Sequence, residues 1–377
     1  MLIVAPGSGG GRVAESVKAR ARRASLLKNE DFSHLLGLTS VSDVAVYLSK
    51  GAYAPIFKGF EIDRIRRADL EFLLGVSLLA ESVAFKHYAG RKDKKFLDLW
   101  QEYFDVMLFK NHFRRKMGTP EWDPRLAADR GDDVLDMVGD YQLTLVDKDK
   151  LFSADSLNDI IMSVKNAELR AALLEALSGS EDASAVRAPE IQKTGFNVGM
   201  ALERHYLNNL YAHVAGLGGT EGQWLRVLVG TKVDLINIYW VYRVRRFFNM
   251  SPEEALTQIL KARYRLDFNI LTKAAFAEPD GMKGVLAGTP YAGVFDVDDG
   301  NAALRELEIE RRIYAFVLAV AERVFLSGTL GFQNVAAYLT LKMLEVRDLI
   351  VVTETIRYGL DRSKAGLLLC RSLGKVN

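Results

Sequence analysis

The spacing of the prolines limits what this chain can fold into more than any other feature of its sequence. Proline breaks the interior of a helix. The eight prolines leave four long tracts without one: residues 56–119, 125–188, 190–251 and 291–377. Apolar residues recur within them in steps of three and four, as in Val335, Leu339, Met343, Val346 and Ile350. This spacing places them on one helix face, so it predicts long amphipathic helices and an all-α fold.

Helix starts can also be read from the sequence. Ser251 is followed by Pro252 and, three residues on, by Glu254, which predicts a capping box with proline in the first turn. Ser40 offers a similar start before Val41. Residues 233–248 are apolar nearly all round, so we expect this helix to be buried between others. Short extended pieces are expected at most over residues 1–5 and 294–297.

Composition describes a folded chain with balanced charge. Apolar residues make up 49% of the 377 residues, and 50 Lys and Arg stand against 48 Asp and Glu. This balance disfavours a dedicated nucleic-acid binder. Cys370 is the single cysteine, which fits a reducing compartment and a packed or surface thiol. The best candidate for a membrane span, residues 70–85, is interrupted by Glu71 and Glu81, so no membrane-spanning segment is expected.

Two short sequences occur twice. Residues 18–22 read Lys-Ala-Arg-Ala-Arg and residues 261–265 read Lys-Ala-Arg-Tyr-Arg, while Tyr53-Ala-Pro-Ile-Phe57 resembles Tyr291-Ala-Gly-Val-Phe295 at nearly the same separation. Shared order and spacing predict related helical units that stack and bury one another's faces. The expected organisation is listed from the N-terminus: a flexible segment 1–16, unit 1 at 17–120, unit 2 at 121–250 and unit 3 at 251–377.

Acidic residues inside apolar stretches mark each expected unit. Asp105, Asp234 and Glu345 are each expected to open a helix, and Arg114 and Arg243 follow the first two at the same distance of nine residues. A second carboxylate, Asp348, follows Glu345. An unpaired buried charge is costly, so these carboxylates need partners, and we expect them to tie neighbouring units together. A proton-handling role has no supporting histidine or lysine pattern.

A search for chemistry finds no specific motif. The glycines at 7 and 9–11 lack the Lys-Ser/Thr ending of a phosphate loop, and Asp31 with His34 forms a single, unrepeated metal-type pair. We therefore predict no catalytic site, metal or cofactor. Four basic runs, some with interleaved aromatic residues, leave RNA binding as an alternative. We interpret them instead as helix ends that favour cations; they are Arg22-Arg23, residues 91–95, residues 114–116 and residues 243–246.

The tract from Ala337 to Ile350, with Glu345 and Asp348, resembles the last-unit signature of the C (or d) subunits of V-type ATPases and ATP synthases. Asp234, Asn237 and Arg243 resemble the second-unit signature, and Asp105 with Arg114 resembles the first-unit signature more faintly. The chain departs from the family pattern in its glycine-rich start, in Gln333-Asn334 where proline is usual, and in Asp348 where asparagine is usual.

The resemblance implies three similar helical subdomains arranged as a funnel. It also implies a non-catalytic connector of the central stalk, in the cytoplasm and peripheral to the membrane, that carries torque between rotor and ion translocation. The implied partners are rotor-shaft subunits of the D/F type and the membrane proteolipid ring, with the membrane stator subunit as a further candidate and no nucleic acid. A generic helical-repeat scaffold and an RNA-binding protein are the alternatives.

Overall fold

The computed structural model describes residues 8–117, 142–177, 188–297 and 302–373. Over these ranges the ordered elements are α-helices and short 3-10 helices, together with an isolated β-bridge between Val146 and Val164. The expected all-α fold is confirmed.

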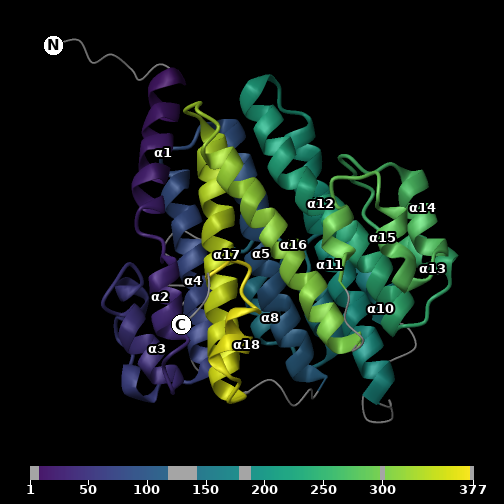
Figure 1. Cartoon of the computed structure of the whole chain (residues 1–377), viewed down its shortest axis with the longest axis horizontal. Helices are drawn as coiled ribbons and strands as arrows, with labels where there is room; N and C mark the ends of the chain where they lie inside the picture. The colour runs from purple at the N-terminus through teal and green to yellow at the C-terminus, as the bar shows by residue number, and fades with distance from the viewer. Residues whose placement is uncertain (1–7, 118–141, 178–187, 298–301, 374–377) are drawn as a thin grey trace.

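Long helices form the centre of the molecule (Figure 1). They are α4 (Arg67–Lys86), α5 (Arg91–Lys116), α11 (Ala188–Ala215), α12 (Gly219–Phe247), α16 (Ala302–Phe325) and α17 (Phe332–Arg357). Each contacts the next in this order, and α17 contacts α4, which closes the series. We call this arrangement the helix ring. α12 also contacts α17 across it, and α1 (Ser8–Arg23) packs along the outside of α17.

Short helices form three lobes that flank the helix ring. The N-terminal lobe (residues 24–65) holds α2 (Asn29–Leu35), α3 (Val41–Leu48), η1 (Ala54–Phe57) and η2 (Ile62–Arg64). The middle lobe (residues 143–177) holds α8 (Lys148–Phe152), α9 (Leu157–Met162) and α10 (Ala167–Leu177). The late lobe (residues 252–295) holds α13 (Pro252–Gln258), α14 (Phe268–Phe276), η3 (Pro279–Gly281), α15 (Met282–Val285) and η4 (Ala292–Phe295). A last short helix, α18 (Arg362–Gly366), follows α17.

The helices of the ring are joined in pairs by short turns at one end of the molecule. These turns are residues 87–90 between α4 and α5, residues 216–218 between α11 and α12, and residues 326–331 between α16 and α17. All three lie at the upper end of the view in Figure 1. We call this end, with its three turns and the adjoining helix termini, the hairpin end.

Local sequence signals predicted the helix starts correctly. Ser251 accepts a hydrogen bond from the Glu254 amide and caps α13, with Pro252 in its first turn. Ser40 caps α3 in the same way, through the Asp43 amide. A side-chain oxygen at this position satisfies an amide that has no partner within the helix.

The N-terminal segment differs from the expectation that residues 1–16 are flexible. α1 begins at Ser8, and Glu15 and Ser16 are buried. The reason is tertiary, because the Ser16 hydroxyl donates a hydrogen bond to Asn334 Oδ1 of α17 at 2.8 Å. Residues 1–7, including the extended piece expected at 1–5, lie outside the described residues. The other extended piece was expected at residues 294–297. That prediction is wrong for residues 294–295, because the 3-10 helix η4 continues to Phe295.

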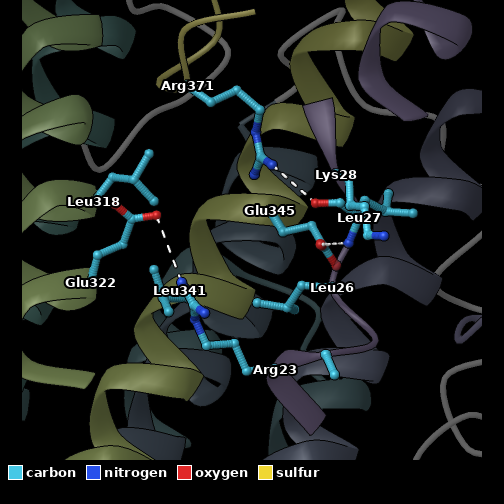
Figure 2. Close-up of a pocket in the computed structure, with 10 residues that line it drawn as sticks. Arg23, Leu26, Leu27, Lys28, Leu318, Glu322, Leu341, Glu345 and Arg371 are labelled. Carbon is cyan, nitrogen blue, oxygen red and sulfur yellow. Dashed lines mark hydrogen bonds and ion pairs between the residues drawn. The ribbon is translucent and has the colours of Figure 1, made fainter. Parts of the chain in front are cut away.

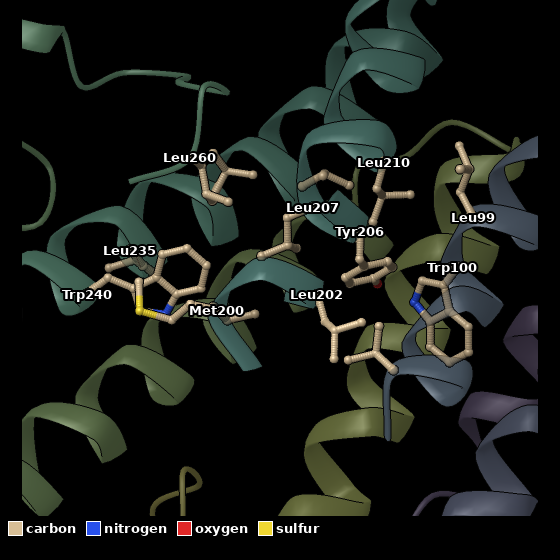
Figure 3. Packing of buried hydrophobic residues seen from close by; sticks show 14 of the residues in the cluster. Leu99, Trp100, Met200, Leu202, Tyr206, Leu207, Leu210, Leu235, Trp240 and Leu260 are labelled. Atoms are coloured by element: carbon tan, nitrogen blue, oxygen red, sulfur yellow. The ribbon is translucent and has the colours of Figure 1, made fainter. Parts of the chain in front are cut away.

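Two apolar clusters form the core. In the larger one, Trp100 of α5 lies on one side of α11, and Leu235 and Trp240 of α12 lie on the other (Figure 3). The predicted burial of residues 233–248 is confirmed from Val233 to Val244, with the basic end of α12 more exposed. The smaller cluster joins the N-terminal lobe to α17 and to the C-terminal segment around Leu369. The two ends of the chain therefore share one core.

Candidate functional site

Three helices of the ring each bury a carboxylate near the middle of their length. Asp105 in α5 and Asp234 in α12 are 0% exposed, and Glu345 in α17 is 1% exposed. The expectation that each opens a helix is wrong, because each helix begins at least a dozen residues earlier. A buried carboxylate at mid-helix cannot use the free amides of a helix start, so it must take its donors from another segment.

Asp105 and Asp234 take their donors from backbone amides of a lobe. Asp105 Oδ2 accepts from the amides of Thr144 and Leu145 at 2.8 and 2.6 Å. Asp234 accepts from the amides of Tyr264 and Arg265 at 2.9 and 2.7 Å. Each carboxylate thus fixes one lobe against one helix of the ring, the middle lobe on α5 and the late lobe on α12.

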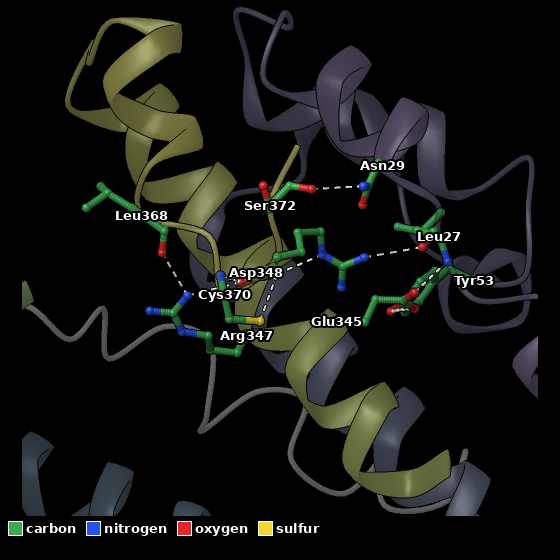
Figure 4. A network of polar contacts seen from close by, with 10 residues as sticks. Leu27, Asn29, Tyr53, Glu345, Arg347, Asp348, Leu368, Cys370 and Ser372 are labelled. Carbon is green, nitrogen blue, oxygen red and sulfur yellow. Dashed lines mark hydrogen bonds and ion pairs between the residues drawn. The ribbon is translucent and has the colours of Figure 1, made fainter. Parts of the chain in front are cut away.

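Glu345 plays the same part for the N-terminal lobe, although that lobe lies at the other end of the sequence (Figure 4). It accepts from the Leu27 amide at 2.5 Å and from the Tyr53 hydroxyl at 2.8 Å. Lys342, itself buried, donates to it at 2.8 Å and lies 3.6 Å from the centre of the Tyr53 ring. Glu345 therefore joins the beginning of the chain to the last long helix.

One of the two repeated sequences occupies matching positions in the structure, and the other does not. Tyr53 and Tyr291 each precede a 3-10 helix, and each donates its hydroxyl to a mid-helix carboxylate at 2.8 Å, Tyr53 to Glu345 and Tyr291 to Asp234. They therefore occupy matching places. Residues 18–22 lie within α1, whereas residues 261–265 lie in an irregular segment before α14, so these two are not equivalent.

The residues three positions after two of these carboxylates extend the same contacts. Asn237 accepts from the Leu260 amide at 2.7 Å and donates to the Ala262 carbonyl at 3.0 Å. Asp348 accepts from the Cys370 amide at 2.9 Å and from Arg371 Nε at 2.8 Å. With aspartate in place of asparagine, this position gains an ion pair that holds the C-terminal segment on α17 (Figure 4).

Cys370 is a packed thiol. It is 3% exposed, and its Sγ lies 3.1 Å from Asp348 Oδ2. Burial, and then the charge of Asp348, raise the pKa of this thiol far above its usual range. A thiol held in its neutral form is a poor nucleophile.

The structure does not bring the two predicted arginines to the carboxylates. Nine residues along a helix correspond to a rise of about 13 Å, which is too far for direct contact. Arg114 is exposed near the end of α5. Arg243 pairs with Glu306 of α16 at 2.9 Å and lies 5.5 Å from the ring centres of Phe196 and Tyr239.

A pocket of about 310 Å³ lies where the end of α1, the start of the N-terminal lobe, α16, α17 and the C-terminal segment meet (Figure 2). Most of its charged lining is already engaged: Glu345 with Lys342, Arg371 with Asp348, and Arg23 with Glu322 at 4.0 Å. The pocket joins charges that hold the fold. Across the described residues, no group of three or more histidine, cysteine or acidic side chains is placed to hold a metal.

Sequence reasoning missed a set of polar and aromatic side chains that five helices of the ring bring together. We call it the inner polar set: Tyr103 of α5, Tyr206 of α11, Lys232 of α12, Tyr314 of α16 and Met343 of α17. Burial, and then the charges of Glu310 and Tyr103, raise the pKa of Tyr314, so its hydroxyl lies near that of Tyr103. Lys232 Nζ lies 5.8 and 5.9 Å from the ring centres of Tyr103 and Tyr206, and 4.0 Å from Met343 Sδ. The ring centres of Tyr103 and Tyr206 are 6.1 Å apart.

Water reaches the inner polar set at Tyr103, whereas Tyr206 is buried. Tyr103 is 37% exposed although side chains of other ring helices surround it. Burial lowers the pKa of Lys232 to about 8, so its charge is costly at neutral pH. A lysine in the mostly apolar helix α12 was the one signal in the sequence that pointed to this set, but its partners come from segments far apart in the chain.

The geometry thus defines the class of protein. Over the described residues it is all-helical, with a closed ring of long helices and three lobes docked against the ring. In the described part of the chain, none of the helices combines the length and apolarity needed to cross a bilayer.

Comparison with known proteins agrees with this class. The model of the ATP synthase (C/AC39) subunit family matches residues 16–366. The chain is 24% identical over 362 residues to the C subunit of the A-type ATP synthase of Methanobrevibacter smithii, covering 93% of this chain and 85% of that protein. It is 21% identical over 349 residues to the corresponding protein of Methanosphaera stadtmanae, covering 91% and 83%. The chain belongs to the ATP synthase (C/AC39) subunit family.

Proposed function

We propose that this protein is the non-catalytic connector of a rotary A/V-type ATPase, placed between the rotor-shaft subunits and the membrane proteolipid ring. Family membership supports the complex. The observation that carries the connector role is the helix ring with its three buried carboxylates, each of which fixes a lobe to one helix.

A connector that transmits torque must be stiff. Close-packed interiors transmit strain with little compression, and buried, fully bonded polar groups specify one arrangement of the elements they join. The fixed lobes brace the ring from outside, and Glu345 joins the first lobe to the last long helix.

We also propose a division into three units that differs from the boundaries at 120 and 250. Each unit is a pair of ring helices with the lobe that its carboxylate binds. The pairs are α4 with α5, α11 with α12, and α16 with α17, and the last pair takes the N-terminal lobe. In sequence the third unit is therefore split between the two ends of the chain.

We further propose that the inner polar set is the surface that receives the rotor shaft. A tyrosine-rich surface with a partly buried lysine offers large, rigid contacts and a charged anchor, which is typical of binding centres. The cost of holding Lys232 charged at neutral pH is consistent with a residue kept for a partner.

Replacing Tyr103 and Lys232 together with alanine should weaken binding to purified D/F-type shaft subunits by tenfold or more, on the order expected for central interface residues. Titration calorimetry measures this affinity. The matched control replaces Leu174, which is also 37% exposed, and the exposed Lys150, both with alanine in the middle lobe. Equal affinities of the two variants would reject the inner polar set as the shaft site.

A further inference from the structure

The hairpin end carries a concentration of exposed positive charge. Arg91, Lys92, Lys94 and Lys95 at the start of α5 are exposed, as is Arg323 in the last turn of α16. Of the nearby acidic residues, Asp93 is buried, Asp98 pairs with Lys86 at 2.6 Å, and Glu221 accepts a hydrogen bond from the Phe332 amide. Glu322, beside Arg323, is half-exposed and lies 4.0 Å from Arg23. The surface of this end is therefore strongly basic.

A favourable interaction with a helix C-terminus does not explain the basic run at residues 91–95. Runs at Arg22-Arg23, residues 114–116 and Arg245-Arg246 lie at helix C-termini, where the helix dipole favours cations. The run at 91–95 forms the N-terminus of α5, where the dipole disfavours them, so our prediction that it caps a helix C-terminus is wrong. Four cations at this position cost stability unless a partner supplies negative charge.

The three turns form one continuous surface. His213 Nε2, at the end of α11, lies 3.1 Å from the Lys92 carbonyl oxygen. Glu221 of α12 binds the Phe332 amide of α17 at 3.0 Å, and the Phe332 ring lies 5.3 Å from that of Phe96 in α5. Burial, and also the charges of Lys95 and Lys92, lower the pKa of His213. The basic residues and the turns thus hold fixed positions relative to one another.

Apolar side chains project from the turns beside these cations. Tyr88 is 54% exposed, Leu326 is 65% exposed and Leu330 is 48% exposed. Tyr88 lies on the turn between α4 and α5, and Leu326 and Leu330 lie at the two ends of the turn between α16 and α17. Basic side chains with isolated aromatic and leucine residues at the tips are typical of surfaces that lie in the headgroup layer of a membrane.

We propose that the hairpin end binds the surface of a bilayer that contains anionic phospholipids. This deepens the proposed function, because it adds the lipid beside or within the proteolipid ring as a second partner. Lipid phosphates neutralise the cations of α5 and remove their conflict with the helix dipole, and the headgroup layer accepts Tyr88, Leu326 and Leu330 wherever they stand. An RNA would require stacking platforms, and one face of Tyr88 is already taken by Lys18, with Nζ 4.2 Å from the ring centre.

The test is sedimentation of the full chain with vesicles of phosphatidylcholine alone or with about 30% phosphatidylglycerol. The wild-type chain should partition to the anionic vesicles at least tenfold better than to the neutral ones. Replacing Lys92, Lys94 and Lys95 with glutamine should remove most of this preference. The matched control replaces three exposed lysines of the lobes, Lys50, Lys58 and Lys150, with glutamine and should keep it.

Circular dichroism first establishes that both triple variants keep the helical content of the wild type. No preference of the wild-type chain for anionic vesicles, or an equal loss in both triple variants, would overturn the proposal. So would a preference that an equimolar single-stranded RNA abolishes, which would identify RNA as the partner. Because no other subunit is present, failure here leaves binding to the shaft and to the ring untouched.

Discussion

Replacing Asp234 with alanine is expected to lower the free energy of unfolding by about 4 kcal/mol. The carboxylate is fully buried and accepts from two backbone amides and from the Tyr291 hydroxyl. Alanine leaves these donors buried without an acceptor, and each unsatisfied donor costs about 1–3 kcal/mol. Urea denaturation followed by circular dichroism measures the change.

Graded variants test whether the hydrogen bonds themselves account for that loss. Tyr291→Phe removes one donor and its need for an acceptor, so it should cost only about 1 kcal/mol. Asp234→Asn keeps one acceptor oxygen and should fall between the two. Glu253→Ala, at an exposed carboxylate, should stay within about 0.5 kcal/mol of the wild type. If Asp234→Ala behaves like Glu253→Ala, the carboxylate does not fix the late lobe.

The second large effect is expected at Glu345. Alanine here leaves the buried Lys342 without its counter-charge and the Leu27 amide and Tyr53 hydroxyl without an acceptor. Removing one partner of a buried ion pair costs about 3–5 kcal/mol. The N-terminal lobe should also loosen from α17, which hydrogen exchange would detect as faster exchange across residues 24–65 than across the middle lobe.

A double-mutant cycle separates the ion pair from the other contacts. Lys342→Met alone leaves Glu345 with two donors, and in the double variant with Glu345→Ala no buried charge remains unpaired. The double variant should therefore lose less stability than the sum of the single variants, with a coupling of about 1–3 kcal/mol. Additive losses, or unchanged exchange in the N-terminal lobe, would contradict the role given to Glu345.

The local part of the fold could be predicted from the sequence. Helix periodicity and the caps at Ser40 and Ser251 depend on residues three or four apart, so the structure confirms them. The equivalence of Tyr53 and Tyr291 could also be predicted, because both begin a similar five-residue sequence. In the structure each precedes a short 3-10 helix.

The remainder depends on contacts between distant segments. Ser16 is buried because Asn334 lies beside it, and nothing within residues 1–16 indicates that contact. The position of Glu345 in its helix was misread for a similar reason, since its donors come from Leu27 and Tyr53, about three hundred residues earlier. The inner polar set takes its members from five helices, so no window of the sequence contains it.

We propose that one copy of this protein joins the rotor shaft to the proteolipid ring. Native mass spectrometry of the chain mixed with D/F-type shaft subunits and the detergent-solubilised ring measures this directly. We expect a single complex with one copy of the chain, which is lost when the chain is omitted. A chain that stays monomeric, or shaft and ring that associate equally well without it, would show that the protein is not the connector.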